Sequence, residues 1–279
     1  MCRVLKVSSS GYYKWVKNRP NDGESNIDDK DFLIRTEFNR FNKKYGSPKL
    51  SESLRSKGYD ISQSSIARRM RKMSLCARKK KKYMKTTDSD HDYKVADNLL
   101  DQNFTSYSPN AVWVSDITYI ATVTGWMYLV IILDLFSRKI VSWQTSETLE
   151  RYFVLEALNL AILRRNPSKG LIFHSDRGVQ YACHDFKDAL ERNGFLQSMS
   201  AKGNCYDNAV AESFFKILKY ELIDDYKFYG KEDLDRVLFK KIDMEYNRQR
   251  IHSTIGYKTP DQFELNHLNQ SRLSECPLS

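Results

Sequence analysis

The chain has 279 residues, of which 45 are Lys or Arg and 35 are Asp or Glu, so its formal net charge is +10. An apolar content of 41% excludes a globally disordered chain, and the longest apolar run, from Trp126 to Leu133, is too short for a membrane-spanning helix. The positive charge favours a polyanionic partner, most often nucleic acid, although ribosomal and membrane-surface proteins share this property. The five Cys residues form no CxxC pair and follow no secretory leader, so we expect a soluble protein of a reducing cytoplasm.

The length predicts about two compact units with smaller appendages. Composition and turn residues divide the chain into four segments. We expect an N-terminal helical segment and linker over 1–25, a helix-turn-helix-like region with a basic tail over 26–95, a mixed α/β unit over 105–230 and a C-terminal helical extension over 231–279.

The second segment predicts DNA binding. Apolar spacing predicts a helix over 27–41, and two shorter helices over 49–57 and 62–73 flank Gly58, with Ser62 as the expected N-cap. No acid interrupts the basic residues between Arg68 and Lys85. A solvated charged face would explain part of this run, but its length favours contact with the DNA backbone. The expected DNA contacts here are Arg68, Arg69, Arg71, Lys72, Lys79, Lys80, Lys81 and Lys82.

The third segment alternates strands and helices. Residues rich in β-branched and aromatic side chains predict strands over 112–122, 126–135, 139–146, 171–175 and 195–200. Helical periodicity covers 149–165 and 185–192, and a last helix begins near Asn208. This order predicts an α/β fold with a mixed five-stranded sheet flanked by helices, in which ligand sites gather at strand ends.

Three acids in this segment predict a metal site. Asp116 interrupts the apolar run from Val112 to Ile120, where an acid is costly to bury. Asp176 follows a strand, and Glu212 comes after 35 intervening residues, off the apolar stripe of its helix. Singly, each could cap a turn or face solvent. Together, if the fourth strand lies beside the first, they would suit two Mg²⁺ ions and displacement at phosphorus.

Two lysines extend this predicted site. At 100° per residue, Lys216 and Lys219 rise from the same face of the helix as Glu212, where their amines would bind DNA phosphates. His174 could be a base or a ligand, but we favour a supporting role.

The combination of motifs resembles bacterial insertion-sequence transposases of the OrfB type, which share the retroviral-integrase catalytic core. The resemblance runs from Gly11 to Phe263. Its motifs are Asp116-Ile117-Thr118-Tyr119, Asp134-Leu135-Phe136-Ser137-Arg138, His174-Ser175-Asp176-Arg177-Gly178-Val179-Gln180-Tyr181, Gly203-Asn204-Cys205-Tyr206-Asp207-Asn208-Ala209, Glu212-Ser213-Phe214-Phe215-Lys216, and Tyr246-Asn247-Arg248-Gln249-Arg250-Ile251-His252 followed by Gly256-Tyr257-Lys258-Thr259-Pro260.

The resemblance implies an RNase H-like fold and a catalytic, metal-binding triad of Asp116, Asp176 and Glu212, with Lys219 at the matching basic position. It implies that an activated water cuts the transposon end and that the freed 3′-hydroxyl then attacks target DNA. Mg²⁺ is the expected cofactor, with two ions and Mn²⁺ as a substitute. A hydrolytic nuclease of the same fold and a DNA-binding regulator without catalysis are the alternatives.

Further expectations concern partners. The resemblance implies double-stranded DNA, a homo-oligomer on DNA, no membrane, and a bacterial, nucleoid-associated protein. In such families the active form is often a frameshift fusion, and this chain begins where the second frame would begin, so the product of an upstream reading frame is an expected partner. Arg248 and Arg250 are expected DNA contacts, and the motif from Tyr246 to Pro260 otherwise has no role that the sequence explains.

Overall fold

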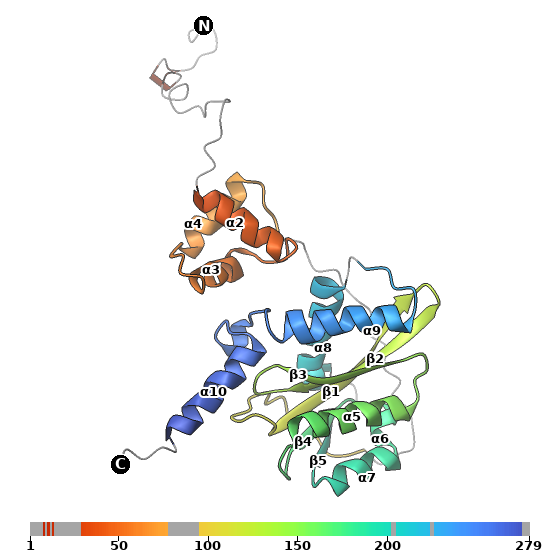
Figure 1. The fold of residues 1–279 in the computed structure, drawn as a ribbon. Coiled ribbons are helices and arrows are strands. Elements are labelled where there is room, and N and C mark those ends of the chain that lie inside the picture. Colours follow the sequence, from red (N-terminus) through yellow and green to blue (C-terminus); the bar gives the residue numbers. More distant parts are fainter. Residues whose placement is uncertain are drawn as a thin grey trace. The chain divides into compact units, whose positions relative to one another are not determined.

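A computed structural model describes residues 8, 10, 11, 13, 29–77, 95–201, 205–223 and 226–274. The chain divides into two compact units, Met1–Arg78 and Lys79–Ser279, and each is described by itself (Figure 1). The N-terminal segment predicted over 1–25 lies almost entirely outside the described residues.

The first unit contains three described helices, α2 (Asp29–Arg40), α3 (Ser47–Arg55) and α4 (Gln63–Lys72). Their apolar faces meet at the fully buried Ile34, Leu50 and Ile66. Ser62 caps α4 as predicted, because its hydroxyl accepts the main-chain N–H of Ser65 at 3.3 Å. The predicted pair of helices around a turn is therefore confirmed.

The second unit is built on a five-stranded sheet with the order β3-β2-β1-β4-β5. The strands β1 (Val112–Thr122), β2 (Gly125–Asp134) and β3 (Ile140–Ser146) form the predicted antiparallel meander. The strands β4 (Ile172–Ser175) and β5 (Leu196–Met199) run parallel to β1, and β4 lies beside β1. The mixed sheet expected from the order of elements is confirmed.

Helices cover both faces of this sheet (Figure 1). One face packs on α5 (Arg151–Arg165), α6 (Val179–Ala182) and α7 (His184–Arg192). The opposite face packs on α8 (Ala209–Ile217), its continuation η2 (Leu218–Leu222), α9 (Lys231–Phe239) and η3 (Lys240–Tyr246). Because strand side chains alternate between faces, Trp113 joins the first cluster and Val114 joins the second. The central strands are consequently buried on both sides.

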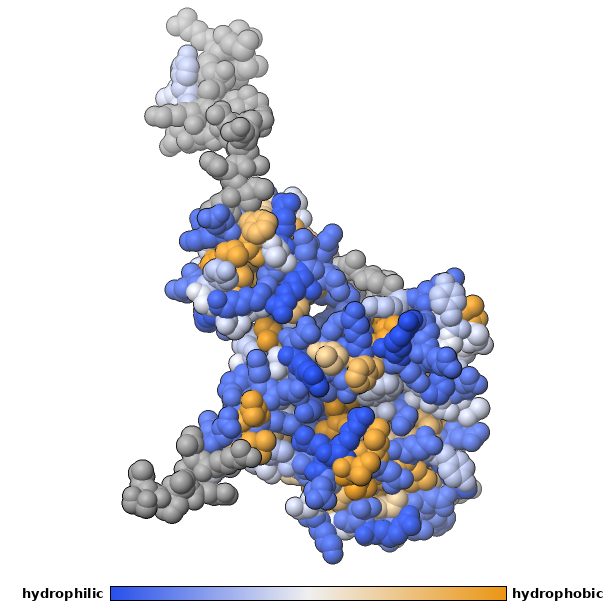
Figure 2. Space-filling view, in the orientation of Figure 1, coloured by the Kyte–Doolittle hydropathy of each residue, from blue (hydrophilic) through white to orange (hydrophobic). Residues whose placement is uncertain are grey.

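The C-terminal part belongs to the same hydrophobic core as α8. Leu234, Leu238, Ile242 and Tyr246 pack into the cluster that contains Phe214. The short turn η4 (Ser253–Ile255) and the helix α10 (Pro260–Ser274) follow. In the part of the chain that the structure describes, no helix combines the length and hydrophobicity needed to cross a bilayer. Figure 2 shows that polar side chains cover most of the face in view.

Candidate active site

Asp116 lies on the central strand of the sheet. Main-chain pairing joins Val112, Val114 and the residue between them to β4, each opposite the residue 60 positions later in the chain. Asp116 comes two residues after the last of these pairs and is 9% exposed. The N–H of Ile117 donates to its Oδ1 at 2.9 Å, which fixes the rotation of the carboxylate. Asp116 is therefore an acid within an apolar strand, just beyond the last residue of β1 that pairs with β4.

Asp176 immediately follows β4. Continuing the register by the same 60 positions would set Asp176 opposite Asp116. Its Oδ1 accepts the N–H of Gly178 at 2.9 Å. A Cβ atom added at Gly178 would lie 3.0 Å from the same oxygen, so a side chain at this position would crowd the carboxylate. Glycine therefore permits the tight turn that holds Asp176 at the strand end.

The charges of both aspartates act on a buried tyrosine, Tyr181. The ring of Tyr181 is fully buried, and its hydroxyl lies 2.8 Å from the hydroxyl of Ser115. Burial raises the pKa of Tyr181 well above its usual range, and the negative charges of Asp176 and Asp116 raise it further. Both carboxylates therefore act on the same hydroxyl, as expected for two acids on neighbouring strands.

Glu212 approaches from α8, which packs against β1. Ala211, Phe214 and Phe215 are buried against the sheet, whereas the Glu212 side chain is 27% exposed, off the stripe as predicted. Lys216 Nζ lies 3.8 Å from the Glu212 carboxylate. Glu212 thus forms an ion pair with Lys216, which lies one turn further along the same helix.

Lys219 points from the same helix face toward β1. Its ammonium lies 4.9 Å from the centroid of the Tyr119 ring, three residues after Asp116. Burial lowers the pKa of Lys219, and the charge of Asp116 opposes that shift. The attraction between the two groups means that Lys219 supplies positive charge beside the aspartate.

The described residues contain no group of three or more His, Cys, Asp or Glu side chains placed closely enough to hold a metal ion. Asp116, within β1, and Asp176, just after the end of β4, nevertheless offer hard oxygen donors on neighbouring strands. Mg²⁺ in phosphoryl-transfer sites commonly takes one or two protein carboxylates and completes its shell with water and substrate phosphates. The two aspartates fit such a donor set, and the Glu212 carboxylate lies beside Lys216.

The predicted DNA contacts on the helical unit divide by exposure. Arg68, Arg71 and Lys72 are exposed on α4. Arg69 Nη1 donates to Asp31 on α2 at 2.6 Å, with its side chain only 19% exposed, so Arg69 joins two helices. The predicted contacts Lys79, Lys80, Lys81 and Lys82 lie outside the described residues.

The two arginines of the C-terminal motif differ from each other in exposure. Arg250 is 8% exposed, and its guanidinium is committed to Glu221 through two hydrogen bonds, whereas a DNA contact requires an accessible side chain. Arg248 is 60% exposed but lies 3.7 Å from the carboxylate of Asp261. For Arg250 the structure favours an internal role over the predicted DNA contact.

His174 is fully buried, with Nδ1 2.8 Å from the Ser198 hydroxyl, and burial lowers its pKa to about 4. This neutral, hydrogen-bonded histidine fits the supporting role that the sequence favoured. Tyr119 and Tyr181 were missed by the sequence reasoning, although both stand within the quoted motifs, three residues after Asp116 and five after Asp176.

Comparison with known proteins defines the class. Residues 106–205 and 193–260 each match the integrase core domain family, and residues 28–83 match the HTH-like domain family. A chain of the simian T-cell lymphotropic virus intasome, solved by cryo-electron microscopy with PP2A regulatory subunit B56 gamma, aligns over 83% of this chain and 74% of its own. That alignment has 17% identity and a TM-score of 0.49.

Two curated relatives give the family. Transposase InsF for insertion sequence IS3A of Escherichia coli K12 is 38% identical over 270 residues, covering 96% of this chain and 94% of the relative. An uncharacterized 31 kDa protein of insertion element IS600 from Shigella sonnei is 39% identical over 94% of this chain and 97% of its own length. The chain belongs to the insertion-sequence transposases that include InsF, which are DDE-type polynucleotidyl transferases with an integrase core.

Proposed function

We propose that the protein cuts double-stranded DNA at the ends of an insertion sequence and joins the freed 3′-hydroxyl to a target phosphodiester. The observation that best supports this proposal is the pairing of β1 with β4, whose register, if continued, would set Asp176, just after the end of β4, opposite Asp116 within β1; Lys219 is directed toward Asp116. Both steps are displacements at phosphorus, which need positioning and charge stabilisation and no covalent protein intermediate.

Each residue has a defined task in this proposal. Asp116 and Asp176 are carboxylates whose rotation is fixed by main-chain N–H donors. Lys219 and Lys216 neutralise DNA phosphates that reach the site. When bound, two Mg²⁺ ions, for which Mn²⁺ can substitute, stabilise the charge on the attacking and leaving oxygens.

Glu212 is proposed to complete the donor set when DNA binds. Its partner Lys216 has a side chain that is 61% exposed and is therefore accessible to a phosphate. Exposed ion pairs of this kind contribute little free energy, so a phosphate can compete for Lys216 and release the glutamate. This competition would couple DNA binding to assembly of the site.

The partners are also proposals. A chain that joins two transposon ends to one target requires more than one active site, which favours a homo-oligomer on DNA. The product of an upstream reading frame is a further proposed partner for end recognition, and action at the nucleoid follows from a DNA substrate. Exposed Arg68 and Arg71 on α4 support DNA contact by the helical unit.

The proposal is tested with labelled insertion-sequence ends and a supercoiled plasmid target in Mg²⁺. Asp116→Asn keeps the size of the side chain and removes its charge. We expect it to bind the end DNA but to lose cutting and joining by at least about a hundredfold. The matched control is Asp188→Asn, which changes an exposed acid on α7 and should act like the wild type.

The products separate the alternatives. Joined plasmid supports strand transfer, whereas cut ends without joined plasmid identify a hydrolytic nuclease. Undiminished cutting by Asp116→Asn would refute the assignment of the site.

A further inference from the structure

The motif from Tyr246 to Pro260 has no part in the chemistry proposed above, yet its side chains are deeply engaged. It begins at the end of η3, continues through an extended bridge between His252 and Lys258, and reaches α10. Its polar side chains Asn247, Arg250 and His252 are all less than 9% exposed. Buried polar groups of this kind are kept where they make specific contacts.

One end of the motif binds the edge of the sheet. The Asn247 carboxamide accepts the N–H of Ile140 and donates to its carbonyl, both at 3.0 Å. Ile140 is the first residue of β3, the edge strand, so Asn247 satisfies a pair of main-chain groups there as a neighbouring strand would.

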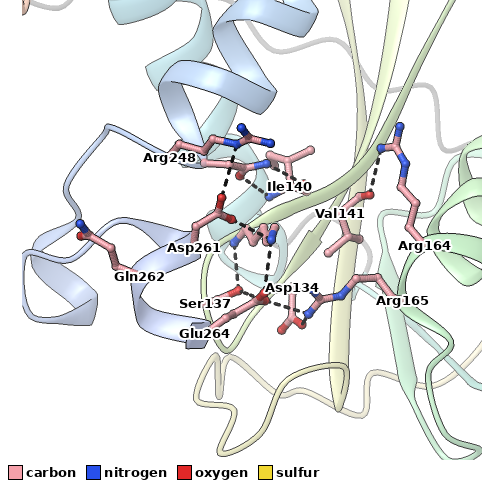
Figure 3. Close-up of polar contacts among 12 residues, drawn as sticks. Asp134, Ser137, Ile140, Val141, Arg164, Arg165, Arg248, Asp261, Gln262 and Glu264 are labelled. Carbon is pink, nitrogen blue, oxygen red and sulfur yellow. Dashed lines mark hydrogen bonds and ion pairs between the residues drawn. The ribbon is translucent and has the colours of Figure 1, made fainter. Parts of the chain in front are cut away.

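The segment after the motif is fixed to the same region (Figure 3). Glu264 of α10 accepts two hydrogen bonds from Arg165 at 2.8 and 2.9 Å and one from Ser137 at 2.8 Å. Asp261 lies 2.7 Å from Lys139 Nζ. The β2–β3 turn and the end of α5 thus anchor the start of α10, and with it the C-terminal end of the motif.

The other contacts of the motif reach the helix that carries Glu212. Arg250 donates to Glu221 through Nε at 2.7 Å and through Nη2 at 3.0 Å, and both side chains are about one-tenth exposed. The Tyr246 ring meets the Phe214 ring edge-on at 4.9 Å. Phe214 is two residues after Glu212, and Glu221 is two residues after Lys219. The motif therefore contacts the helix close to both Glu212 and Lys219.

The helix is irregular between these contacts. It changes from α to π geometry at Leu218, at the start of η2. π turns are rare and often lie at functional sites, and their geometry sets the direction of the side chains that follow. A bidentate pair between planar groups fixes both distance and angle, so Arg250 can hold the π turn in one orientation.

We propose that Arg250 and Glu221 are positioning residues. Their ion pair joins the motif, which is bound to the edge of the sheet, to the α8–η2 helix, and it thereby holds Glu212 and Lys219 in a fixed position relative to Asp116. The inference rests on the proposed roles of those residues. In this proposal Arg250 positions the helix instead of contacting DNA.

The experiment uses the full chain with Arg250→Lys, Glu221→Gln and the double variant Arg250→Gln with Glu221→Gln. Single-turnover cutting of end DNA is measured beside DNA affinity. We expect each single variant to slow cutting by tenfold to about a hundredfold while DNA affinity changes less than about twofold. The double variant, in which two amides can pair, should recover part of the lost rate.

A second readout follows the helix directly. Hydrogen–deuterium exchange over residues 209–222 should be faster in each single variant than in the wild type. Arg236→Ala is the matched control, because it removes an arginine from an exposed ion pair with Asp233 on α9. It should leave both cutting and exchange unchanged.

The outcomes are distinguishable. Wild-type cutting and unchanged exchange in Arg250→Lys would overturn the inference, as would weakened DNA binding with normal single-turnover cutting, which identifies a DNA contact. If the wild type cuts no DNA, the proposed function fails, and the exchange data still decide whether the pair holds the helix. Should Arg250→Lys fail to fold, Glu221→Gln carries the same two readouts.

Discussion

Burial at Asp134 has a measurable cost. Its carboxylate is fully buried in the β2–β3 turn and accepts N–H groups from Phe136 at 2.9 Å and Asn110 at 2.8 Å. Burial and, to a smaller extent, nearby Glu264 raise its pKa, whereas the two N–H donors and Arg165 lower it, and the net result is a rise from 3.8 to about 6. The ionised form is therefore less favourable in the folded protein than in the unfolded chain.

The sign of the pH dependence follows from this raised pKa. Between about pH 4 and pH 6 the folded protein holds the Asp134 proton more tightly, so this residue lowers stability as the pH rises. The full effect is about 3 kcal/mol. Asp134→Asn cannot titrate and should lack this decline, whatever its constant cost. Urea unfolding across the range measures it, and parallel profiles for the two proteins would contradict the prediction.

At the scale of elements, α4 combines two kinds of arginine. Arg69 is partly buried against Asp31, whereas Arg68 and Arg71 are exposed. We expect Arg68→Ala and Arg71→Ala each to weaken DNA binding and to reduce the slope of log affinity against log salt by about 1. Arg69→Ala should instead lower the free energy of unfolding by about 1–3 kcal/mol.

Salt titrations and urea unfolding of the full chain measure these effects. An unchanged salt slope in the double variant of Arg68 and Arg71 would remove α4 from the DNA interface. The basic run from Lys79 to Lys82 is a further predicted contributor, and replacing it with Ala should also flatten the salt dependence.

The elements themselves were largely predictable. A high content of β-branched and aromatic residues located the three strands of the meander, and 3.6-residue patterns located α5 and α8. The short helix α6 was missed, because four residues carry no helical periodicity. The contacts of the C-terminal motif could not be predicted, since Asn247 and Ile140 are 107 residues apart and neither residue type implies the other.

The site was predictable only in part for the same reason. An acid that breaks the pattern of an apolar strand indicated Asp116, and the pairing of β1 with β4 supports the expectation that Asp176 lies near it. Arg250 was assigned to DNA because sequence shows its charge and not its burial. The sequence does not show that the buried carboxylate of Glu221 lies beside Arg250, and without that contact a basic side chain suggests DNA binding.

At the scale of the whole molecule, the net charge and the fold both favour DNA as the partner. The net charge of +10 gives a long-range attraction for DNA, and the neighbouring strands β1 and β4 carry Asp116 and lead into Asp176. Glu212 remains paired with Lys216 in this arrangement. In the proposed mechanism, DNA must therefore bind before Glu212 completes the site.

Anomalous diffraction from crystals grown with end DNA and Mn²⁺ tests this claim most directly. We expect manganese to be bound by carboxylate oxygens of Asp116, Asp176 and Glu212, with a DNA phosphate oxygen in the same shell and Lys216 moved onto the DNA. Manganese bound elsewhere, or bound by the two aspartates with Glu212 still paired to Lys216, would contradict it.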